Sequence, residues 1–314
     1  MLLKHIKIAL ICLLIAVPLL VYGIYLNSTK IHLLARGNYF FEATRNSADI
    51  TQIEIVFPNQ KSIHIQKTDN FWRISEADGY YASFAKINAL VSLIRNTVIY
   101  RADYIHEKEM DLFENPLKII SSDKNGNIVD EAIIAPLKDG NKYYYALLNN
   151  DNFLYQLNSN FELSSYVMDW VQMPLFTFNI SNVKRIKNDD FEVYRRFDDE
   201  NFKDVHSSNE YSHLQQLLDN FWYLSADEIK NANFVNFDNF SKIKHFEITL
   251  FNGIIYEIDL FSQDLDYWIS VHLNREGLID KSSLQQIKEN SLLYDGWLFK
   301  INSSKGAIIS EFIL

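Results

Sequence analysis

The sequence predicts an α+β protein: an N-terminal transmembrane helix followed by two copies of an antiparallel-sheet-plus-helix unit, packed together as an elongated body. Three observations predict it. A long uncharged run opens the chain, alternating apolar residues are followed by a helical stripe, and this order recurs in the second half. The predicted domains are a cytoplasmic stub and anchor at residues 1–26, a connector at 27–49, a first repeat at 50–178 and a second repeat at 180–314.

The run Ile8–Leu26 contains 19 residues without a charge. As a helix it would span about 28 Å, close to the ~30 Å hydrocarbon core of a bilayer. Lys4 and Lys7 precede it, and positive charge favours the cytoplasmic side. We therefore expect a single-pass protein of the inner (cytoplasmic) membrane, held through residues 8–26, with a cytoplasmic N-terminus and a periplasmic body. The alternative is a cleaved signal peptide, whose apolar core is usually shorter and ends in small residues. Both interpretations export the body.

Composition restricts the classes of function. Hydrophobic residues make up 48% of the chain, which is enough for a sizeable core, and the net charge is -10. Such an acidic protein would repel nucleic acid, so no nucleic-acid partner is expected. The only cysteine, Cys12, lies in the apolar run. Disulfides, thiolate metal sites and a cysteine nucleophile are therefore excluded from the body.

The first repeat begins with alternating apolar residues and continues with helical spacing. The alternation runs through Ile53–Phe57, Ile63–Ile65 and Trp72–Ile74, with turn residues between the segments. Apolar residues within Ile87–Ile94 then follow the i, i+3, i+4, i+7 spacing of one helix face. This order predicts a three-stranded meander and then a helix.

The second half repeats this order, with a helical stripe at Leu214–Phe221. Matched positions lie 124 to 127 residues apart: Leu90 with Leu214, Ala102 with Ala226, Asn125-Gly126 with Asn252-Gly253, and Trp170 with Trp297. An Asn-Gly pair within β-type sequence is a strong hairpin signal. A period of this length indicates duplicated domains rather than a solenoid.

The two halves resemble a known family. Asn70–Ile74, Tyr100–Asp103, Lys142–Tyr145 and Phe153–Leu157 look like the domain-of-unknown-function family four-three-four-zero, and Leu224–Asp227 fits the same pattern in the second half. The resemblance covers most of residues 50–300. It implies an N-terminally anchored exported protein that accompanies ABC transporters of the gliding-motility or auxiliary type. It supplies no functional residues.

The constellations that could carry chemistry have simpler interpretations. His106–Met110 begins like a zincin helix but has methionine in place of the second histidine. Asp123–Asn127 is faintly like a calcium loop, although a hairpin turn explains it better. Asp198–Glu200 and the pair Asp264 and Asp266 could be paired carboxylates, but acidic residues in polar loops are usually solvated turns.

No catalytic, cofactor-binding or metal-binding residue is therefore predicted, and the chain is not expected to be an enzyme or to carry a cofactor. We expect a membrane-anchored extracytoplasmic accessory or assembly protein that acts by protein–protein contacts, associated with the subunits of an ABC transporter. The alternatives are a module that binds the cell envelope or acts there as a scaffold, and an exported hydrolase.

Overall fold

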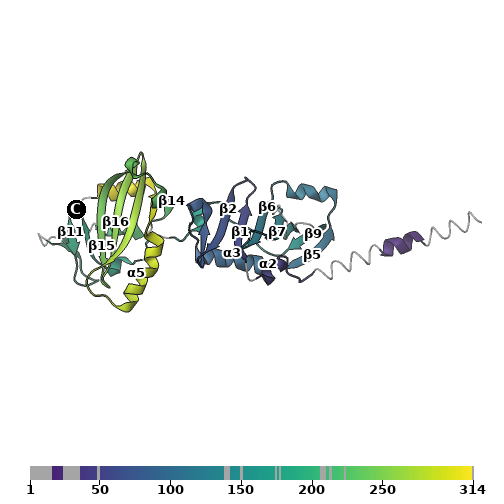
Figure 1. The fold of residues 1–314 in the computed structure, drawn as a ribbon, viewed down its shortest axis with the longest axis horizontal. Helices are drawn as coiled ribbons and strands as arrows, with labels where there is room; N and C mark the ends of the chain where they lie inside the picture. Colours follow the sequence, from purple (N-terminus) through teal and green to yellow (C-terminus); the bar gives the residue numbers. More distant parts are fainter. Residues whose placement is uncertain are drawn as a thin grey trace, which may run out of the picture. The chain divides into compact units, whose positions relative to one another are not determined.

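The chain folds mainly into two antiparallel sheets of nine strands each (Figure 1). The computed structural model describes residues 16–23, 36–47, 50–137, 142–148, 151–173, 175–176, 178–205, 210–211, 214–222 and 224–312. The chain divides into two compact units. Unit 1 comprises Met1–Asn70 and Ala85–Ser165, and unit 2 comprises Phe71–Phe84 and Tyr166–Leu314.

The first sheet has the strand order β4-β3-β2-β1-β6-β7-β8-β9-β5. Its strands are β1 (Ile50–Val56), β2 (Ser62–Thr68), β3 (Phe71–Ile74), β4 (Tyr80–Tyr81), β5 (Ile99–Tyr104), β6 (Leu117–Asp123), β7 (Ile128–Ile134), β8 (Tyr144–Leu148) and β9 (Phe153–Leu157). The helices in this part of the chain are α2 (Glu42–Asn46), α3 (Phe84–Asn96) and the 3-10 turns η1 (Ser75–Ala77) and η2 (Glu107–Phe113).

The second sheet has the strand order β13-β12-β11-β10-β15-β16-β17-β18-β14. Its strands are β10 (Val183–Asn188), β11 (Glu192–Tyr194), β12 (Phe202–Asp204), β13 (Glu210–Tyr211), β14 (Ala226–Asn231), β15 (Ser241–Leu250), β16 (Ile254–Gln263), β17 (Asp266–Arg275) and β18 (Trp297–Ile301). The helices are α4 (Leu214–Trp222), α5 (Lys281–Tyr294), α6 (Ser303–Glu311) and the 3-10 turns η3 (Val167–Trp170), η4 (Ile180–Asn182), η5 (Ala232–Phe234) and η6 (Phe237–Asn239).

The two sheets share one topology, because β1 to β9 in the first sheet occupy the same places as β10 to β18 in the second. The irregularities match as well. The β5–β9 ladder shifts register between Ile99 and Arg101, and the β14–β18 ladder shifts between Ala226 and Glu228. Ile99 and Ala226 therefore hold equivalent positions, 127 residues apart.

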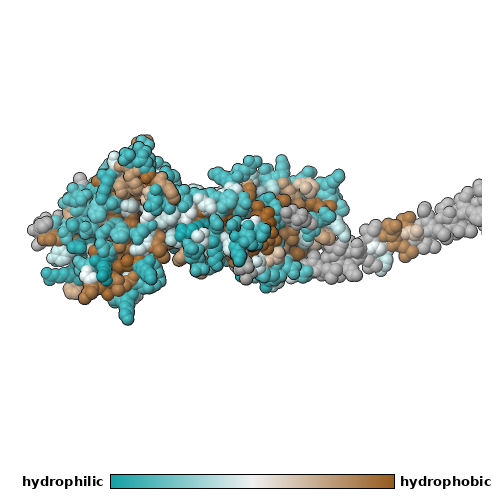
Figure 2. All heavy atoms as spheres, viewed as in Figure 1, coloured by the Kyte–Doolittle hydropathy of each residue, from teal (hydrophilic) through white to brown (hydrophobic). Residues whose placement is uncertain are grey.

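Each unit buries its own apolar residues. Ile87, Leu90 and Ile94 form the buried face of α3, as the spacing predicts. The equivalent face of α4 consists of buried apolar residues: Leu214, Leu217, Leu218 and Phe221. Hydrophilic side chains cover most of the visible surface, with apolar residues in small groups between them (Figure 2).

The predicted α+β class is wrong. The described residues form mostly two large antiparallel sheets, and their helices are few. The prediction gave each helical stripe the same weight as the strands around it, whereas α3 and α4 are each accompanied by nine strands. The predicted meander at β1–β3 and the two hairpin turns are present.

The predicted transmembrane helix is also corrected. Among the residues that the structure describes, no helix is long and apolar enough to cross a membrane. Of the predicted span 8–26, only residues 16–23 are described, as a short helix, and the rest lies outside the described residues. The inner-membrane location and the signal anchor rested on that helix, so both predictions are withdrawn with it.

Around the helices, the predicted alignment of the two halves is shifted by three residues from the structural one. Ala226 corresponds to Ile99 rather than to Ala102, which lies beyond the register shift. A helical stripe recurs every three or four residues, so a slip of three places one stripe on the next. Trp170 and Trp297 are not equivalent either, since Trp170 lies in η3 and Trp297 begins β18.

The two compact units divide the chain at Ser165 and Tyr166, and Phe71–Phe84 groups with unit 2. The predicted connector 27–49 contains Phe40 and Phe41, which are only 1% exposed. Residues 36–47 are therefore part of the fold of unit 1.

Candidate functional site: an acidic pocket in unit 1

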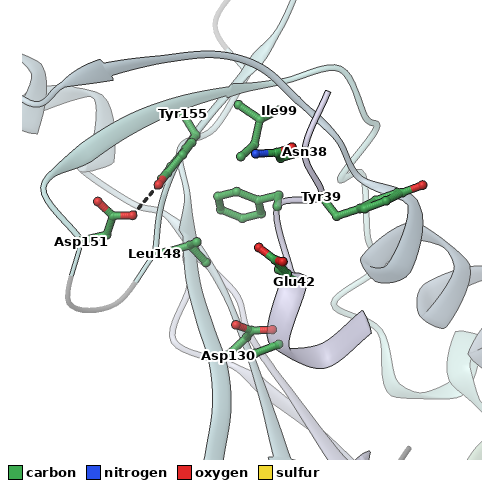
Figure 3. A pocket seen from close by; sticks show the side chains of 10 residues that line it. Asn38, Tyr39, Glu42, Ile99, Asp130, Leu148, Asp151 and Tyr155 are labelled. Carbon is green, nitrogen blue, oxygen red and sulfur yellow. Dashed lines mark hydrogen bonds between the residues drawn. The ribbon is translucent and has the colours of Figure 1, made fainter. Parts of the chain in front are cut away.

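An open cavity of about 510 Å³ lies in unit 1, beside α2 (Figure 3). One wall is the segment 38–43, and the others come from β5, β7, β8 and the start of β9. Side chains from five separate parts of the chain therefore meet there.

The segment 38–43 is held against β5 by backbone pairing. Ile99 donates its N–H to the Asn38 carbonyl at 2.8 Å, and Phe40 donates to the Thr97 carbonyl at 2.9 Å. The ring of Phe40 is buried and meets the ring of Tyr155 edge to face, with centroids 5.4 Å apart. The backbone pairing and the buried ring together position the wall that leads into α2.

Asp130 joins this wall to the sheet. It projects from β7, and its Oδ2 accepts the backbone N–H of Thr44 at 2.6 Å. Thr44 is buried, and its hydroxyl is hydrogen-bonded to the hydroxyl of Ser121 on β6. A carboxylate is favourable at a helix N-terminus, where backbone N–H groups have no partner within the helix. Asp130 thus holds the first turn of α2 in place.

Asp151 lies on the other side of Leu148 from Asp130 (Figure 3). Its Oδ1 accepts the backbone N–H of Phe153 at 2.9 Å, and its Oδ2 accepts the hydroxyl proton of Tyr155. Burial and this hydrogen bond both raise the pKa of Tyr155 above its ordinary value. Tyr155 therefore remains a neutral hydrogen-bond donor at physiological pH.

The lining is acidic. Glu42, Asp130 and Asp151 contribute three carboxyl groups, and the lining contains no lysine, arginine or histidine. Arg45 is not among the lining residues: its guanidinium lies over the ring of Tyr39, 3.4 Å from its centroid. Arg45 also donates to the Arg95 carbonyl at 2.7 Å.

The equivalent position in unit 2 is occupied by aromatic rings. Ser121 pairs with Asp130 across β6 and β7, and Ile248 pairs with Tyr256 at the same place across β15 and β16. Tyr256 is fully buried, where Asp130 is half-buried. Its ring contacts aromatic side chains at centroid distances from 5.0 to 6.3 Å: Phe178, Phe176 and Tyr294.

Helix α5 accounts for part of this difference. It lies between β17 and β18 and ends at Tyr294, one of the filling rings. In unit 1 the equivalent strands, β8 and β9, are joined by residues 149–152 alone. Unit 1 thus keeps an opening in a place where unit 2 is packed.

A second, smaller cavity of about 230 Å³ lies in unit 2 and contains two histidine–aspartate pairs. His245 Nδ1 lies 2.6 Å from Asp259, and His272 Nδ1 lies 2.8 Å from Asp295. Within the part of the chain that the structure describes, no group of three histidine, cysteine or acidic residues could hold a metal ion.

The acidic motifs considered from the sequence are turns or ion pairs. Asp123 accepts the N–H groups of Asn125 and Asn127 at 2.8 and 2.9 Å and so closes the β6–β7 hairpin. The side chain and the backbone N–H of Asn127 lower the pKa of Asp123. His106 caps η2 by donating its backbone N–H to Glu109, and Met110 is exposed.

The two candidate carboxylate pairs are not brought together as reaction centres. Glu200 accepts the N–H groups of Arg196 and Phe197, and the backbone carbonyl of Asp198 accepts from Arg195. Asp266 forms an ion pair with Lys300 at 2.6 Å. Asp264 lies in the tight β16–β17 turn, with a φ of 53°.

Sequence reasoning missed the pocket, because its residues share no local motif. Asp130 belongs to no motif in the sequence, and Glu42 lies in the predicted connector 27–49. The single available signal was the difference between the two halves, which the three-residue slip concealed.

Comparisons with protein-family models, with curated proteins and with solved structures give no match. The resemblance to the domain-of-unknown-function family four-three-four-zero therefore stays a prediction.

Proposed function

We propose that this chain is a non-enzymatic binding protein that acts by contact with another protein, and that the pocket of unit 1 receives a side chain of that partner. The supporting observation is an open cavity in unit 1 at the place where unit 2 is filled by Tyr256 and its neighbouring rings. The fold itself therefore does not require an opening there.

The physical argument concerns packing. Filling a position with buried, closely packed apolar side chains stabilises a fold. A cavity of about 510 Å³ is within the range of ligand-binding clefts, roughly 300–1,000 Å³. In unit 2, aromatic side chains fill the equivalent place. Unit 1 therefore has less apolar burial there than the same fold allows. Recognition of a partner accounts for that loss.

The resemblance described above implies a transporter subunit as the partner. We propose an ABC-transporter subunit on that basis, and the experiment below leaves the partner to be identified by mass spectrometry.

The test fills the pocket. Leu148 is half-buried in the lining, and Leu148→Trp would place an indole in the cavity. Ile128→Trp is the matched control, because Ile128 lies on β7 outside the lining and is 58% exposed. Tagged full-length chains would be purified from detergent-treated cell extract, and bound proteins quantified by mass spectrometry.

We expect the native chain and Ile128→Trp to recover the same protein, and Leu148→Trp to lose about nine-tenths of it with an unchanged melting temperature. A tenfold loss corresponds to about 1.4 kcal/mol of binding free energy. Equal recovery by Leu148→Trp, or repeated recovery of the native chain alone, would contradict the proposal.

A further inference from the structure

We propose that the pocket of unit 1 takes a cationic group, and specifically an arginine or lysine side chain of the partner protein. This inference rests on the proposed function, because it names the chemistry of the group that the pocket receives.

The first argument is charge. The lining contributes three carboxyl groups from Glu42, Asp130 and Asp151 and no basic side chain. Charges interact more strongly beside a low-dielectric wall than in bulk water. The buried ring of Phe40 and the buried side chains of Ile99 and Tyr155 make such a wall. The cavity therefore favours a positive group and repels an anion.

The second argument is hydrogen-bonding capacity. A carboxylate offers about four lone-pair sites. Within the fold, Asp130 accepts from Thr44, and Asp151 accepts from Phe153 and Tyr155, so both retain acceptor capacity. Glu42 is exposed on the first turn of α2 and lines the same cavity as Asp130 (Figure 3). Several acceptors around one cavity suit a guanidinium, which carries five N–H donors, or an ammonium, which carries three.

A neutral apolar group fits the site less well. It would displace water from the three carboxylates without offering donors, and burying an ionised group without a partner is costly. An anionic group would meet both this penalty and repulsion.

The experiment is a titration of the full chain, followed by NMR or calorimetry, with N-acetyl-arginine-methylamide. Its neutral isostere, N-acetyl-citrulline-methylamide, is the matched ligand. Glu42→Gln removes one exposed charge of the pocket, and Glu114→Gln removes an exposed charge outside it. We expect saturable binding of the arginine compound with a Kd on the order of 1 mM. Glu42→Gln should weaken it about threefold, because exposed ion pairs contribute up to about 1 kcal/mol, and Glu114→Gln should not change it.

Three outcomes would overturn the inference: equal binding of the citrulline compound, no saturable binding of the arginine compound, or unchanged binding by Glu42→Gln. Spermidine in the same titration tests the source of the cation. If it binds more than tenfold tighter than the arginine compound, a free polyamine rather than a protein side chain is the occupant, and the assignment to a partner protein is wrong.

The two proposals fail in different ways. If Leu148→Trp loses the partner while the arginine compound does not bind, the pocket is the contact site but the cation is wrong. If the arginine compound binds while Leu148→Trp keeps the partner, the cation site is real and the proposed function is wrong.

Discussion

Arg195 is a buried cation, with only 7% of its surface exposed. Its three nitrogens donate to backbone carbonyls of Val183, Ile180 and Asp198 at 2.6 to 2.8 Å. Its guanidinium also lies over the ring of Phe202, 4.7 Å from the centroid. Burial lowers the pKa of Arg195, and the nearby charge of Asp198 opposes that shift. The side chain therefore ties the end of β11 to the turn before β10.

Replacing Arg195 by methionine tests this role. Arg195→Met keeps an apolar stem but leaves three carbonyl groups without their donor, and each unsatisfied buried group costs roughly 1–3 kcal/mol. We expect a loss of about 3 kcal/mol in the free energy of unfolding of unit 2, measured by denaturant titration. The adjacent exposed Arg196→Met should change it by less than about 0.5 kcal/mol. If Arg195→Met lowers the free energy of unfolding no more than Arg196→Met does, the hydrogen bonds of Arg195 do not stabilise unit 2.

At the scale of elements, α6 depends on a residue that usually weakens helices. Gly306 lies inside α6, and a Cβ built there would overlap the Cβ and Cγ atoms of Tyr267 on β17. The missing side chain is thus what lets α6 approach the sheet.

Gly306→Ala separates helix propensity from packing. Propensity alone would stabilise the helix by about 1 kcal/mol, whereas overpacking costs typically 1–3 kcal/mol. Because the overlap involves the root of the Tyr267 side chain, we expect the packing penalty to win and the melting temperature to fall. The double variant Gly306→Ala, Tyr267→Gly should recover stability relative to Tyr267→Gly alone, because glycine removes both overlapping atoms. A higher melting temperature for the single variant would contradict this account.

The same comparison of elements shows what sequence could and could not predict. The strands β1 to β3, the helices α3 and α4 and the Asn-Gly hairpins carry strong local signals, and all are present. Helix α5 carries a weak one, because only Ser283 and Tyr294 are buried along its 14 residues. The pocket carries none, since Glu42, Asp130 and Asp151 meet only through the packing of 38–43 on the sheet.

At the scale of the whole molecule, the response to acid should differ between the units. Three carboxyl groups of unit 2 have lowered pKa values. A hydrogen bond from the side-chain ammonium of Lys184 lowers the pKa of Glu276. A hydrogen bond from the backbone N–H of Ser283 lowers the pKa of Asp280. Burial would raise that of Asp259, but hydrogen bonds from Lys242 and His245 outweigh it. In unit 1, Asp123 is a carboxyl group with a lowered pKa.

A carboxyl group whose pKa is lower in the folded state stabilises the fold above its unfolded pKa, and this stability is lost as the pH falls through the folded pKa. The ordinary values are 3.8 for aspartate and 4.5 for glutamate, so the loss begins below about pH 4.5. We expect unit 2 to lose hydrogen-exchange protection before unit 1 between pH 5 and pH 3. Glu276→Gln should reduce the pH dependence in unit 2. Earlier loss of protection in unit 1 would contradict the prediction.

The sequence predicts only part of the topology. The recurrence of strands and helix indicated two related halves, and both sheets have one strand order. The class was misjudged in part because the connections before β9 and β17 contain no Asn-Gly or Asp-Gly pair. The membrane prediction relied on residues 8–26, most of which lie outside the described residues.

The filled position around Tyr256 has an evolutionary consequence. A core residue in a single-copy fold is constrained by stability, so few substitutions there survive selection. With the same strand order present twice, each half buries its own core, and a change in one leaves the other intact. A substitution at Asp130, in the half without a helix between the strands equivalent to β17 and β18, therefore leaves the core around Tyr256 intact.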